Sequence, residues 1–283
     1  MAQEPNWFIE KCEECGSGFS LEVTEKLHSE TTPFQTIDIY QTTNYGRLMV
    51  IDGFIMLTQK DNFLYHEMMT HPVLFTHPHP ERVLIIGGGD CGTLKEVLRH
   101  PTVKTVEQIE IDERVTRLSE QFFPELCSAN QDSRASLRFI DGIKWVNDAD
   151  ADSYDVIIVD STDPIGPAEG LFNQAFYQQC HRVLGEKGIL VQQSESPISH
   201  ISLLRSMRKA MSDAGFSTVH TLDFPQPVYP SGWWTATLAF KSGNMQQYRE
   251  QDIKQRPFET LYYSFGKHMA AVEETHYLHK HLT

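Results

Sequence analysis

The sequence predicts an α/β protein with a doubly wound Rossmann-like sheet and a small N-terminal antiparallel β domain. Residues 82–240 alternate short apolar runs with segments of helix length, which is typical of βα units. The apolar runs are continuous, as in "VLII" and "DVIIVD", and such runs suit strands covered on both faces. Residues 19–58 instead alternate apolar and polar side chains between turn signals, which is typical of antiparallel strands. We therefore expect two domains, residues 1–60 and 61–283.

The expected N-terminal strands lie in "FSLEVTEKL", "FQTIDIYQ" and "GRLMVIDGFIMLT", where Asp52-Gly53 is a strong signal for a hairpin turn. A sheet this small needs cover, so we expect it to pack on the main domain or on another subunit. A helix is expected over residues 62–75, ending near Pro78. The strands expected in the main domain are Val83–Ile86, Thr105–Ile109, Leu137–Ile140, Val156–Val159, Ile189–Gln192, Thr218–Thr221 and Thr235–Phe240. The helices expected there are Thr93–Arg99, Glu113–Phe122, Gly142–Asn147, Asn173–Leu184 and Ile201–Ala214.

Acidic residues follow the expected parallel strands, at the sheet edge where ligands of this fold bind. Gly87, Gly89 and Gly92 have the dinucleotide-binding spacing, but Asp90 lies inside their loop and would repel a pyrophosphate. Any one acid could be only a helix cap or a turn residue. Several acids in one cleft would raise one another's pKa unless cations bind between them, so a cationic ligand is favoured. The acids concerned are Asp90, Glu110, Asp141, Asp160 and Asp163.

The same positions favour a nucleoside without phosphate. Glu110 follows the glycines by about 20 residues, where an acid hydrogen-bonds ribose hydroxyls. Asp141 is placed to bind an adenine amino group, and a cationic nucleoside of this kind suggests an S-adenosyl sulfonium compound. The carboxylate of S-adenosylmethionine at 4 Å from Asp90 would cost about 4 kcal/mol at an effective dielectric of 20. Asp90 therefore favours the decarboxylated compound, and aminopropyl transfer over methyl transfer.

Longer motifs identify a family. The segments "YHEMMTHPVLFTHPHPERVLIIGGGDCGTLKEVLRH", "VEQIEIDE", "YDVIIVDSTDPIGPAEGLF" and "VYPSG" closely resemble the polyamine aminopropyltransferases, spermidine synthases above all. The resemblance runs from roughly residue 19 to residue 240. It implies a methyltransferase-type version of the Rossmann-like sheet. It also implies transfer of the aminopropyl group of decarboxylated S-adenosylmethionine to putrescine, giving spermidine and 5′-methylthioadenosine. The family commonly forms homodimers or homotetramers.

The resemblance also assigns site residues. Asp160 is implied as the proton acceptor, with Tyr65 orienting the attacking nitrogen. The implied ligands of the cosubstrate are Gln35, Asp90, Glu110, Asp141, Gly142 and Pro167. The implied lining of the amine channel is Tyr65, His66, Asp90, Asp160, Asp163, Gln193 and Tyr229.

Departures from the family pattern leave the amine open. Met56, Gln59 and Asn62 stand where the family usually has Gln, Glu and Glu, and Cys91 stands where glycine is usual. Putrescine is the expected acceptor, with cadaverine, agmatine and spermidine as alternatives. Three other functions stay open: a methyltransferase on the same fold, a nicotinamide dehydrogenase, and a catalytically silent protein that sequesters polyamines.

Charge and hydropathy exclude other partners. The chain has 24 Lys and Arg against 38 Asp and Glu, a net charge of −14, which disfavours nucleic acid and suits cations. No apolar run approaches the ~20 residues of a membrane span. The first residues lack the pattern of a secretion signal. We therefore expect a cytoplasmic enzyme that binds no membrane.

The cysteines and histidines give no sign of a metal. With no secretion signal, all five cysteines are expected to be reduced thiols. Cys12 and Cys15 form a lone C-x-x-C with no second pair or suitable histidine nearby, so no structural zinc is expected. The histidines of "HPVLFTHPHPER" and "HYLHKH" are expected in a connector and a solvated tail. We expect no metal and no cofactor, and assign no role to Cys12, Cys15 or the tail after Ser242.

Overall fold

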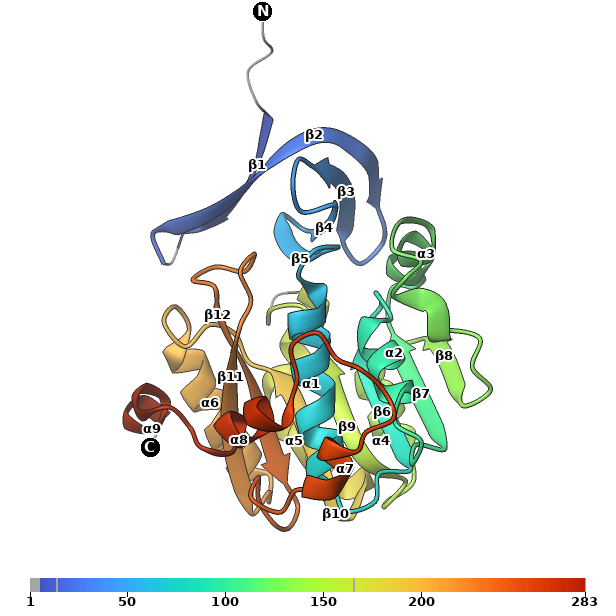
Figure 1. Ribbon diagram of the computed structural model, residues 1–283, viewed down its shortest axis with the longest axis vertical. Coiled ribbons are helices and arrows are strands. Elements are labelled where there is room, and N and C mark those ends of the chain that lie inside the picture. Colours follow the sequence, from blue (N-terminus) through green and yellow to red (C-terminus); the bar gives the residue numbers. More distant parts are fainter. Residues whose placement is uncertain (1–5, 14, 165, 283) are drawn as a thin grey trace, which may run out of the picture.

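The computed structural model describes residues 6–13, 15–164 and 166–282, and it has an N-terminal antiparallel sheet and a larger α/β sheet, as the sequence predicts (Figure 1). The first sheet has its strands in sequential order, each antiparallel to the next. Asp52 and Gly53 form the hairpin turn, both with positive φ (51° and 89°), as a primed turn requires. The strands are β1 (Asn6–Cys12), β2 (Ser17–Thr31), β3 (Thr36–Thr42), β4 (Arg47–Ile51) and β5 (Phe54–Thr58). β1 precedes the region in which we expected strands.

The large sheet has the strand order β11-β12-β10-β9-β6-β7-β8. The neighbours from β10 to β8 are parallel, whereas β12 is antiparallel to both β10 and β11. The sheet is therefore mixed and not wholly parallel, because a short hairpin joins β11 to β12 and such a connection reverses the chain. The strands are β6 (Arg82–Gly87), β7 (Thr105–Glu110), β8 (Ala135–Phe139), β9 (Tyr154–Asp160), β10 (Leu184–Gln193), β11 (Thr218–Pro225) and β12 (Trp233–Phe240).

Helices cover both faces of this sheet, and Figure 1 shows α1 and α2 on the near face. Two buried apolar clusters lie on opposite sides of the strands: one includes Leu74 of α1 and Leu94 of α2, and the other includes Tyr177 of α5 and Met207 of α6. In the described ranges, none of the helices combines the length and apolar character that a membrane crossing needs. The helices are α1 (Asn62–Thr76), α2 (Gly92–Leu98), α3 (Glu113–Phe122), α4 (Gly142–Asp148), α5 (Gln174–Val183) and α6 (Ile201–Asp213), with 3-10 helices η1 (Cys127–Ala129) and η2 (Gly166–Phe172).

The small sheet packs on the main domain, one of the two covers that we expected. Ile37, Ile39 and Leu57 form one buried cluster with Val115 and Leu118 of α3. This contact brings the loop between β2 and β3 next to the carboxyl end of β7. The edge strand β1 keeps large apolar side chains exposed: Trp7 is 49% and Ile9 is 54% exposed.

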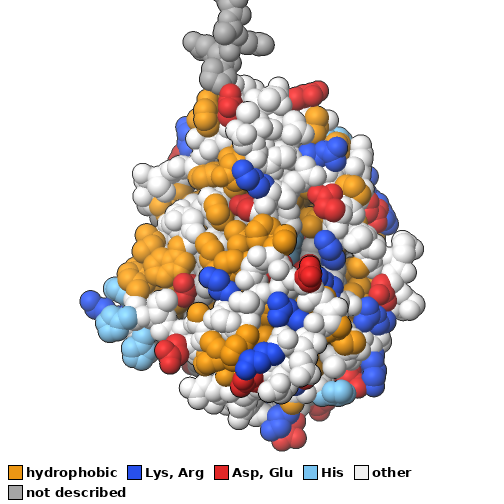
Figure 2. All heavy atoms as spheres, viewed as in Figure 1, with side chains coloured by type: hydrophobic (Ala, Val, Ile, Leu, Met, Phe, Trp, Pro, Cys, Tyr) orange, Lys and Arg blue, Asp and Glu red, His pale blue; other side chains and the backbone are white. Residues whose placement is uncertain are grey.

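The tail after Ser242 returns over α1. It contains α7 (Glu250–Lys254), α8 (Phe265–Val272) and α9 (His276–Leu282). The buried carboxylate of Glu67 accepts backbone N–H groups from residues 261, 262 and 263 at 2.8, 2.9 and 2.7 Å. Figure 2 shows histidine side chains gathered over α9 at the rim of this face. The tail thus satisfies a buried acid of α1, a structural role that the sequence did not indicate.

The turn between β1 and β2 carries a disulfide bond between Cys12 and Cys15, whose Cα atoms lie 5.3 Å apart. Our expectation of reduced thiols at both positions is therefore wrong. The tight turn holds the two side chains within bonding reach. Cys91, Cys127 and Cys180 are free.

Candidate functional site

The glycine loop after β6 packs directly on the end of β9. Gly87 and Gly88 have φ values of 82° and 66°, and the Gly88 amide donates to the carbonyl oxygen of Asp160 at 2.7 Å. A Cβ on Gly87 would lie only 2.2 Å from that oxygen, so a larger residue cannot occupy the position. This close approach brings Asp90, in the loop, and Asp160, at the end of β9, to the same cavity.

The backbone conformation at Cys91 explains why glycine is usual at this position. It caps α2 with a φ of 68°, in the left-handed region that glycine adopts without cost. Its side chain is fully buried. The departure from the family pattern therefore changes the strain of the loop, and Cys91 itself does not line the cavity.

The first cavity lies at the carboxyl ends of β6, β7 and β9. Its apolar wall includes Ile86, Ile109, Val115 and Leu171. It also contains most of the expected ligands of the cosubstrate, namely Gln35, Asp90, Glu110, Asp141 and Gly142. Pro167, the remaining one, belongs to η2, and its side chain lies outside what the structure describes.

Glu110 and Gln35 are held by the same neighbour. A carboxylate oxygen of Glu110 accepts the Asp112 amide at 2.8 Å, and the Gln35 side-chain amide donates to Asp112 at 3.1 Å. Burial raises the pKa of Glu110 to about 7. Asp112 thus positions two residues expected to bind the ribose. The sequence analysis did not identify Asp112, although it is the second acid of "IEID" and could have been found there.

Asp141 has the capping role that its sequence position allows. One of its oxygens accepts the amides of Ile143 and Lys144 at 2.8 and 3.3 Å, which caps α4. The residue is exposed and also lines the first cavity. The second carboxylate oxygen carries none of these capping bonds, which leaves it able to accept a hydrogen bond from a ligand.

Asp160, at the end of β9, lines the first cavity. Its Oδ1 accepts the Tyr65 hydroxyl and its Oδ2 accepts the Thr93 hydroxyl, both at 2.6 Å. Burial, followed by the nearby charge of Asp90, raises the pKa of Asp160. A carboxylate with a raised pKa, held by two hydroxyl groups, is a suitable proton acceptor. Thr93 is a contact that no motif indicated.

Asp90 faces the first cavity but already has a partner. Its Oδ1 accepts the Gly92 amide at 2.7 Å, and its Oδ2 lies 3.2 Å from Nε2 of His66. Burial acts to raise the pKa of Asp90, but the charge and hydrogen bond of His66, with the Gly92 amide, lower it overall. His66 is not among the residues that line either of the two cavities, and it backs Asp90 instead.

The second cavity extends from Tyr65 toward the small sheet. Tyr65, Met56 and Tyr229 line both cavities, and the Tyr229 hydroxyl donates to the Met56 carbonyl oxygen at 2.5 Å. Asp163 and Gln193, which were expected in the amine channel, line the second cavity. The expected site residues therefore come together around two connected spaces, with His66 behind them.

Two further acids line the second cavity. Burial raises the pKa of Glu10 to about 7, and burial with the charge of Glu195 raises the pKa of Asp163 well above its usual range. Burial also raises the pKa of Glu195. Glu195 follows β10 by two residues, so the strand-end rule could have found it. Glu10 lies on β1, and no motif indicated it.

This arrangement can bind a nucleoside and a polycation side by side. Apolar side chains and hydrogen-bonding acids surround the first space, while Glu10, Asp163 and Glu195 surround the second. Among the described residues, no lysine or arginine pairs with these acids, and such acids favour a ligand that supplies positive charge. Asp160, a suitable proton acceptor, lines the first space and is hydrogen-bonded by Tyr65, which lines both spaces.

Comparisons with known proteins give the same class of enzyme. A family model described as spermine/spermidine synthase domain matches residues 62–249, and one described as spermidine synthase tetramerisation domain matches residues 6–59. The polyamine aminopropyltransferase of Nitrosococcus oceani is 61% identical over 96% of this chain and 95% of its own. That of Methylococcus capsulatus is 58% identical over 96% of this chain and 95% of its own.

Solved structures agree. A spermidine synthase in complex with the transition state analogue AdoDATO superposes with a TM-score of 0.95 at 31% identity, covering 99% of this chain and 96% of the other. The spermidine synthase of Thermotoga maritima gives a TM-score of 0.93 at 31% identity, covering 99% and 95%.

Proposed function

Since the chain belongs to the spermine/spermidine synthase family and is a polyamine aminopropyltransferase, we propose that it transfers the aminopropyl group of decarboxylated S-adenosylmethionine to putrescine. The products are spermidine and 5′-methylthioadenosine. The observation that carries the proposal is the half-buried Asp160 carboxylate in the first cavity, which is hydrogen-bonded by Tyr65, a residue that lines both cavities.

The cosubstrate occupies the first cavity in this proposal. Glu110 and Gln35 bind the ribose hydroxyls, and Asp141 and Gly142 bind the adenine, with Pro167 beside it. The apolar wall of the cavity, including Ile109 and Leu171, suits the flat faces of the base. The ribose hydroxyls would donate to the ionised form of Glu110, whose buried carboxylate has few other partners.

Asp90 binds the aminopropyl ammonium of the cosubstrate. Its carboxylate lines the first cavity and is kept ionised by His66 and the Gly92 amide. Charge-assisted hydrogen bonds of this kind are the strong ones. His66 then acts from behind the carboxylate, as a positioning residue.

The diamine occupies the second cavity, with its far ammonium beside Asp163. Gln193 and Tyr229 line the path between that end and Tyr65. The ammonium would ionise the Asp163 and Glu195 carboxylates, whose pKa values are raised while no cation lies between them. Binding of the diamine therefore releases protons from the protein.

The chemical step is a direct displacement. An alkylamine resembles lysine, whose pKa is about 10.4, so it arrives as an ammonium and must lose a proton. Asp160 accepts that proton, and the nitrogen lone pair attacks the methylene carbon next to sulfur. The new C–N bond forms as the C–S bond breaks, and the sulfonium leaves as a neutral thioether. Because the sulfonium is already positively charged, it leaves readily as a neutral thioether, and we therefore expect no cofactor.

Tyr65 orients the nucleophile. Its hydroxyl proton is committed to Asp160 at 2.6 Å, so its oxygen is left to accept a hydrogen bond from the incoming amine. Burial raises the pKa of Tyr65 well above its usual value, so the hydroxyl stays protonated. Holding the amine in line with the C–S bond accelerates the reaction, because the reacting atoms are already close and correctly oriented.

The assembly proposed is a homodimer or homotetramer formed through the small sheet. Residues 6–59 match a tetramerisation domain, and Trp7 and Ile9 of β1 are exposed apolar side chains that a second copy would cover. Light scattering on the purified protein checks this assembly: a monomeric mass would contradict it.

The test of the reaction is incubation with decarboxylated S-adenosylmethionine and each of putrescine, cadaverine, agmatine and spermidine, with products read by mass. Spermidine and 5′-methylthioadenosine should form fastest from putrescine. Preferential use of another amine would overturn the substrate and leave the class of reaction intact. S-adenosylmethionine with the same amines is the control for methyl transfer, and a product with a homocysteine tail would favour the methyltransferase alternative.

A further inference from the structure

Two cysteines and one histidine meet at the rim of the second cavity. Cys12 and Cys15 lie at the turn between β1 and β2, and Sγ of Cys15 is 3.7 Å from Nε2 of His200. The two sulfurs and a ring nitrogen of His200 all lie within 4.8 Å of one another. Sequence reasoning found no third ligand because His200 is 185 residues from Cys15 along the chain.

The separation of Cys15 from His200 fits tetrahedral zinc. Bonds of about 2.3 Å to sulfur and about 2.1 Å to nitrogen, at the tetrahedral angle, separate the two ligand atoms by roughly 3.6 Å. The distance from Cys15 to His200 is 3.7 Å, so Nε2 already has the separation that such a site needs.

The turn holds the two cysteines close together. The Cys15 amide donates to Sγ of Cys12 at 3.2 Å. Gly16 directly after Cys15 has a φ of 61°, which lets the chain reverse without a side chain in the way. C-x-x-C-G at a hairpin tip therefore presents both sulfurs to the same side.

His200 lies beside a buried carboxylate. Its Nδ1 lies 3.2 Å from Oε2 of Glu195, a side chain that is only 2% exposed. A histidine that binds a metal usually donates its other ring N–H to such a carboxylate, which sets the tautomer. With the proton on Nδ1, Nε2 presents its lone pair to the two sulfurs.

We propose that the reduced protein binds one zinc ion through Cys12, Cys15 and Nε2 of His200, with water in the fourth position. The disulfide is the metal-free state of the same two sulfurs. A small-molecule thiol reduces it: two thiol molecules join as a disulfide, and Cys12 and Cys15 gain the two hydrogen atoms. Zinc then displaces the two thiol protons as it binds.

The ion would join two parts of the chain across the cavity. Cys12 belongs to the small sheet and His200 caps the start of α6, and both line the second cavity. Figure 1 shows the β1–β2 hairpin reaching over the end of the large sheet above β12. Zinc binding would hold this hairpin against the catalytic domain, and reduction or oxidation would control that contact.

The test is zinc binding to the full-length protein, with metal removed, in the reduced and the oxidised state. A chromophoric chelator competes for added zinc, and the reduced wild type should bind one ion per chain while the oxidised protein binds none. Cobalt in place of zinc should give the sulfur-to-metal charge-transfer band and the visible bands of a tetrahedral site. X-ray absorption at the zinc edge should show two sulfur ligands, and this measurement depends on no variant.

Matched variants identify the ligands. Cys12→Ser, Cys15→Ser and His200→Asn should each abolish the cobalt bands, whereas Cys127→Ser and His79→Asn should not. Glu195→Gln should lower the zinc affinity by about 10- to 100-fold, the usual effect of losing an outer carboxylate. The proposal would be overturned if the reduced wild type bound no zinc, or if X-ray absorption showed no sulfur ligand on the zinc. Equal loss of the cobalt bands in the control variants would also overturn it.

Discussion

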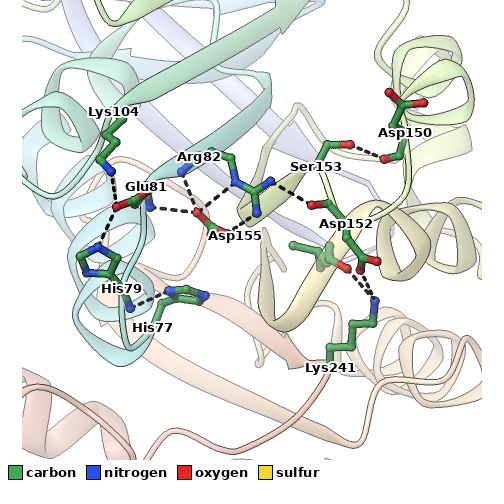
Figure 3. Close-up of polar contacts among 11 residues, drawn as sticks. His77, His79, Glu81, Arg82, Lys104, Asp150, Asp152, Ser153, Asp155 and Lys241 are labelled. Atoms are coloured by element: carbon green, nitrogen blue, oxygen red, sulfur yellow. Dashed lines mark hydrogen bonds and ion pairs between the residues drawn. The ribbon is translucent and has the colours of Figure 1, made fainter.

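Acidic residues at the two ends of the large sheet differ in whether they pair with lysine or arginine. At the amino end, Asp155 accepts the amides of Glu81 and Arg82 at 3.0 and 2.8 Å and pairs with the Arg82 guanidinium at 2.7 Å (Figure 3). Glu81 also pairs with Lys104, and Asp152 pairs with Lys241 at 3.3 Å. Burial acts to raise the pKa of Asp155, but the amides of Glu81 and Arg82 and the Arg82 guanidinium together lower it.

At the carboxyl end, buried and half-buried acids have few cations near them. Among the described residues, no lysine or arginine lines the first cavity, and Lys11 is the one that lines the second. The pKa values of Glu110, Asp160 and Asp163 are all raised, with burial as the largest cause. Paired acids stabilise the fold, whereas acids without a lysine or arginine partner cost stability, which a cationic ligand would offset. Strand ends that look alike in sequence thus carry paired acids at one edge and acids without lysine or arginine partners at the other.

The largest difference is expected from replacing one acid at each end of β9. Asp160→Asn should lower turnover by ~10²-fold or more, as loss of a general base does, while 5′-methylthioadenosine binding stays nearly unchanged. Asp155→Asn is the matched control on the same strand and should keep turnover within about twofold, since it lies outside the cavities. Steady-state kinetics and calorimetric binding measure the two effects. Near-normal turnover of Asp160→Asn would remove its role as proton acceptor.

The next prediction separates the two substrates of the first cavity. Asp90→Asn should weaken decarboxylated S-adenosylmethionine by about 10- to 100-fold, the value of a hydrogen bond to a charged group. It should weaken 5′-methylthioadenosine little, since that product has no aminopropyl group. Affinities of both ligands for the wild type and the variant give the answer. Equal weakening would mean that Asp90 does not face the ammonium.

The strand-end rule explains why much of the candidate site was predictable. The carboxyl ends of parallel strands meet at one edge, so acids directly after β6, β7 and β9 had to converge. Asp90, Glu110 and Asp160 do line one cavity. The fold was predictable for a related reason, because continuous apolar runs and turn residues report burial and chain reversal locally. The same local signals could not reveal that β12 runs antiparallel, since that depends on how a hairpin is placed in the sheet.

Contacts between distant segments were not predictable. His66 was expected in the amine channel, but α1 places it behind Asp90, at 3.2 Å. Glu10 reaches the second cavity only because the small sheet packs on the main domain. His200 meets Cys15 for the same reason. Periodicity and motifs describe neighbours along the chain, and they contain no information on how two sheets are packed together.

The third prediction tests the amino end through stability. Asp155→Asn removes the charge that pairs with Arg82 and weakens the contacts to two backbone amides, so it should lower the free energy of unfolding by about 1–2 kcal/mol. Asp160→Asn should leave that free energy unchanged or raise it, because a half-buried carboxylate with a raised pKa becomes a neutral amide. Chemical denaturation of both variants measures the contrast. A larger loss of stability in Asp160→Asn than in Asp155→Asn would contradict the division of labour between the two edges.

The smallest expected effect is a change in how stability depends on pH. Glu110 has a folded pKa of about 7, above its ordinary value of 4.5, so the ligand-free folded protein holds its proton more tightly than the unfolded chain does. Its contribution to stability is therefore present in full below pH ~4.5 and is lost as the pH rises toward 7. In Glu110→Gln this loss is absent, so the free energy of unfolding should fall less steeply over that window, by at most ~1.4 kcal/mol per pH unit.

The pKa of Glu10 is also raised to about 7, so Glu10 should cause a similar, separate fall in the free energy of unfolding as the pH rises. The variant Glu10→Gln measures this contribution. Asp155 has a lowered pKa and should give the opposite slope, with stability lost as the pH falls, so Asp155→Asn completes the comparison. Parallel pH profiles for all three variants would mean that the two ends of the sheet do not differ in the way that their pairing implies.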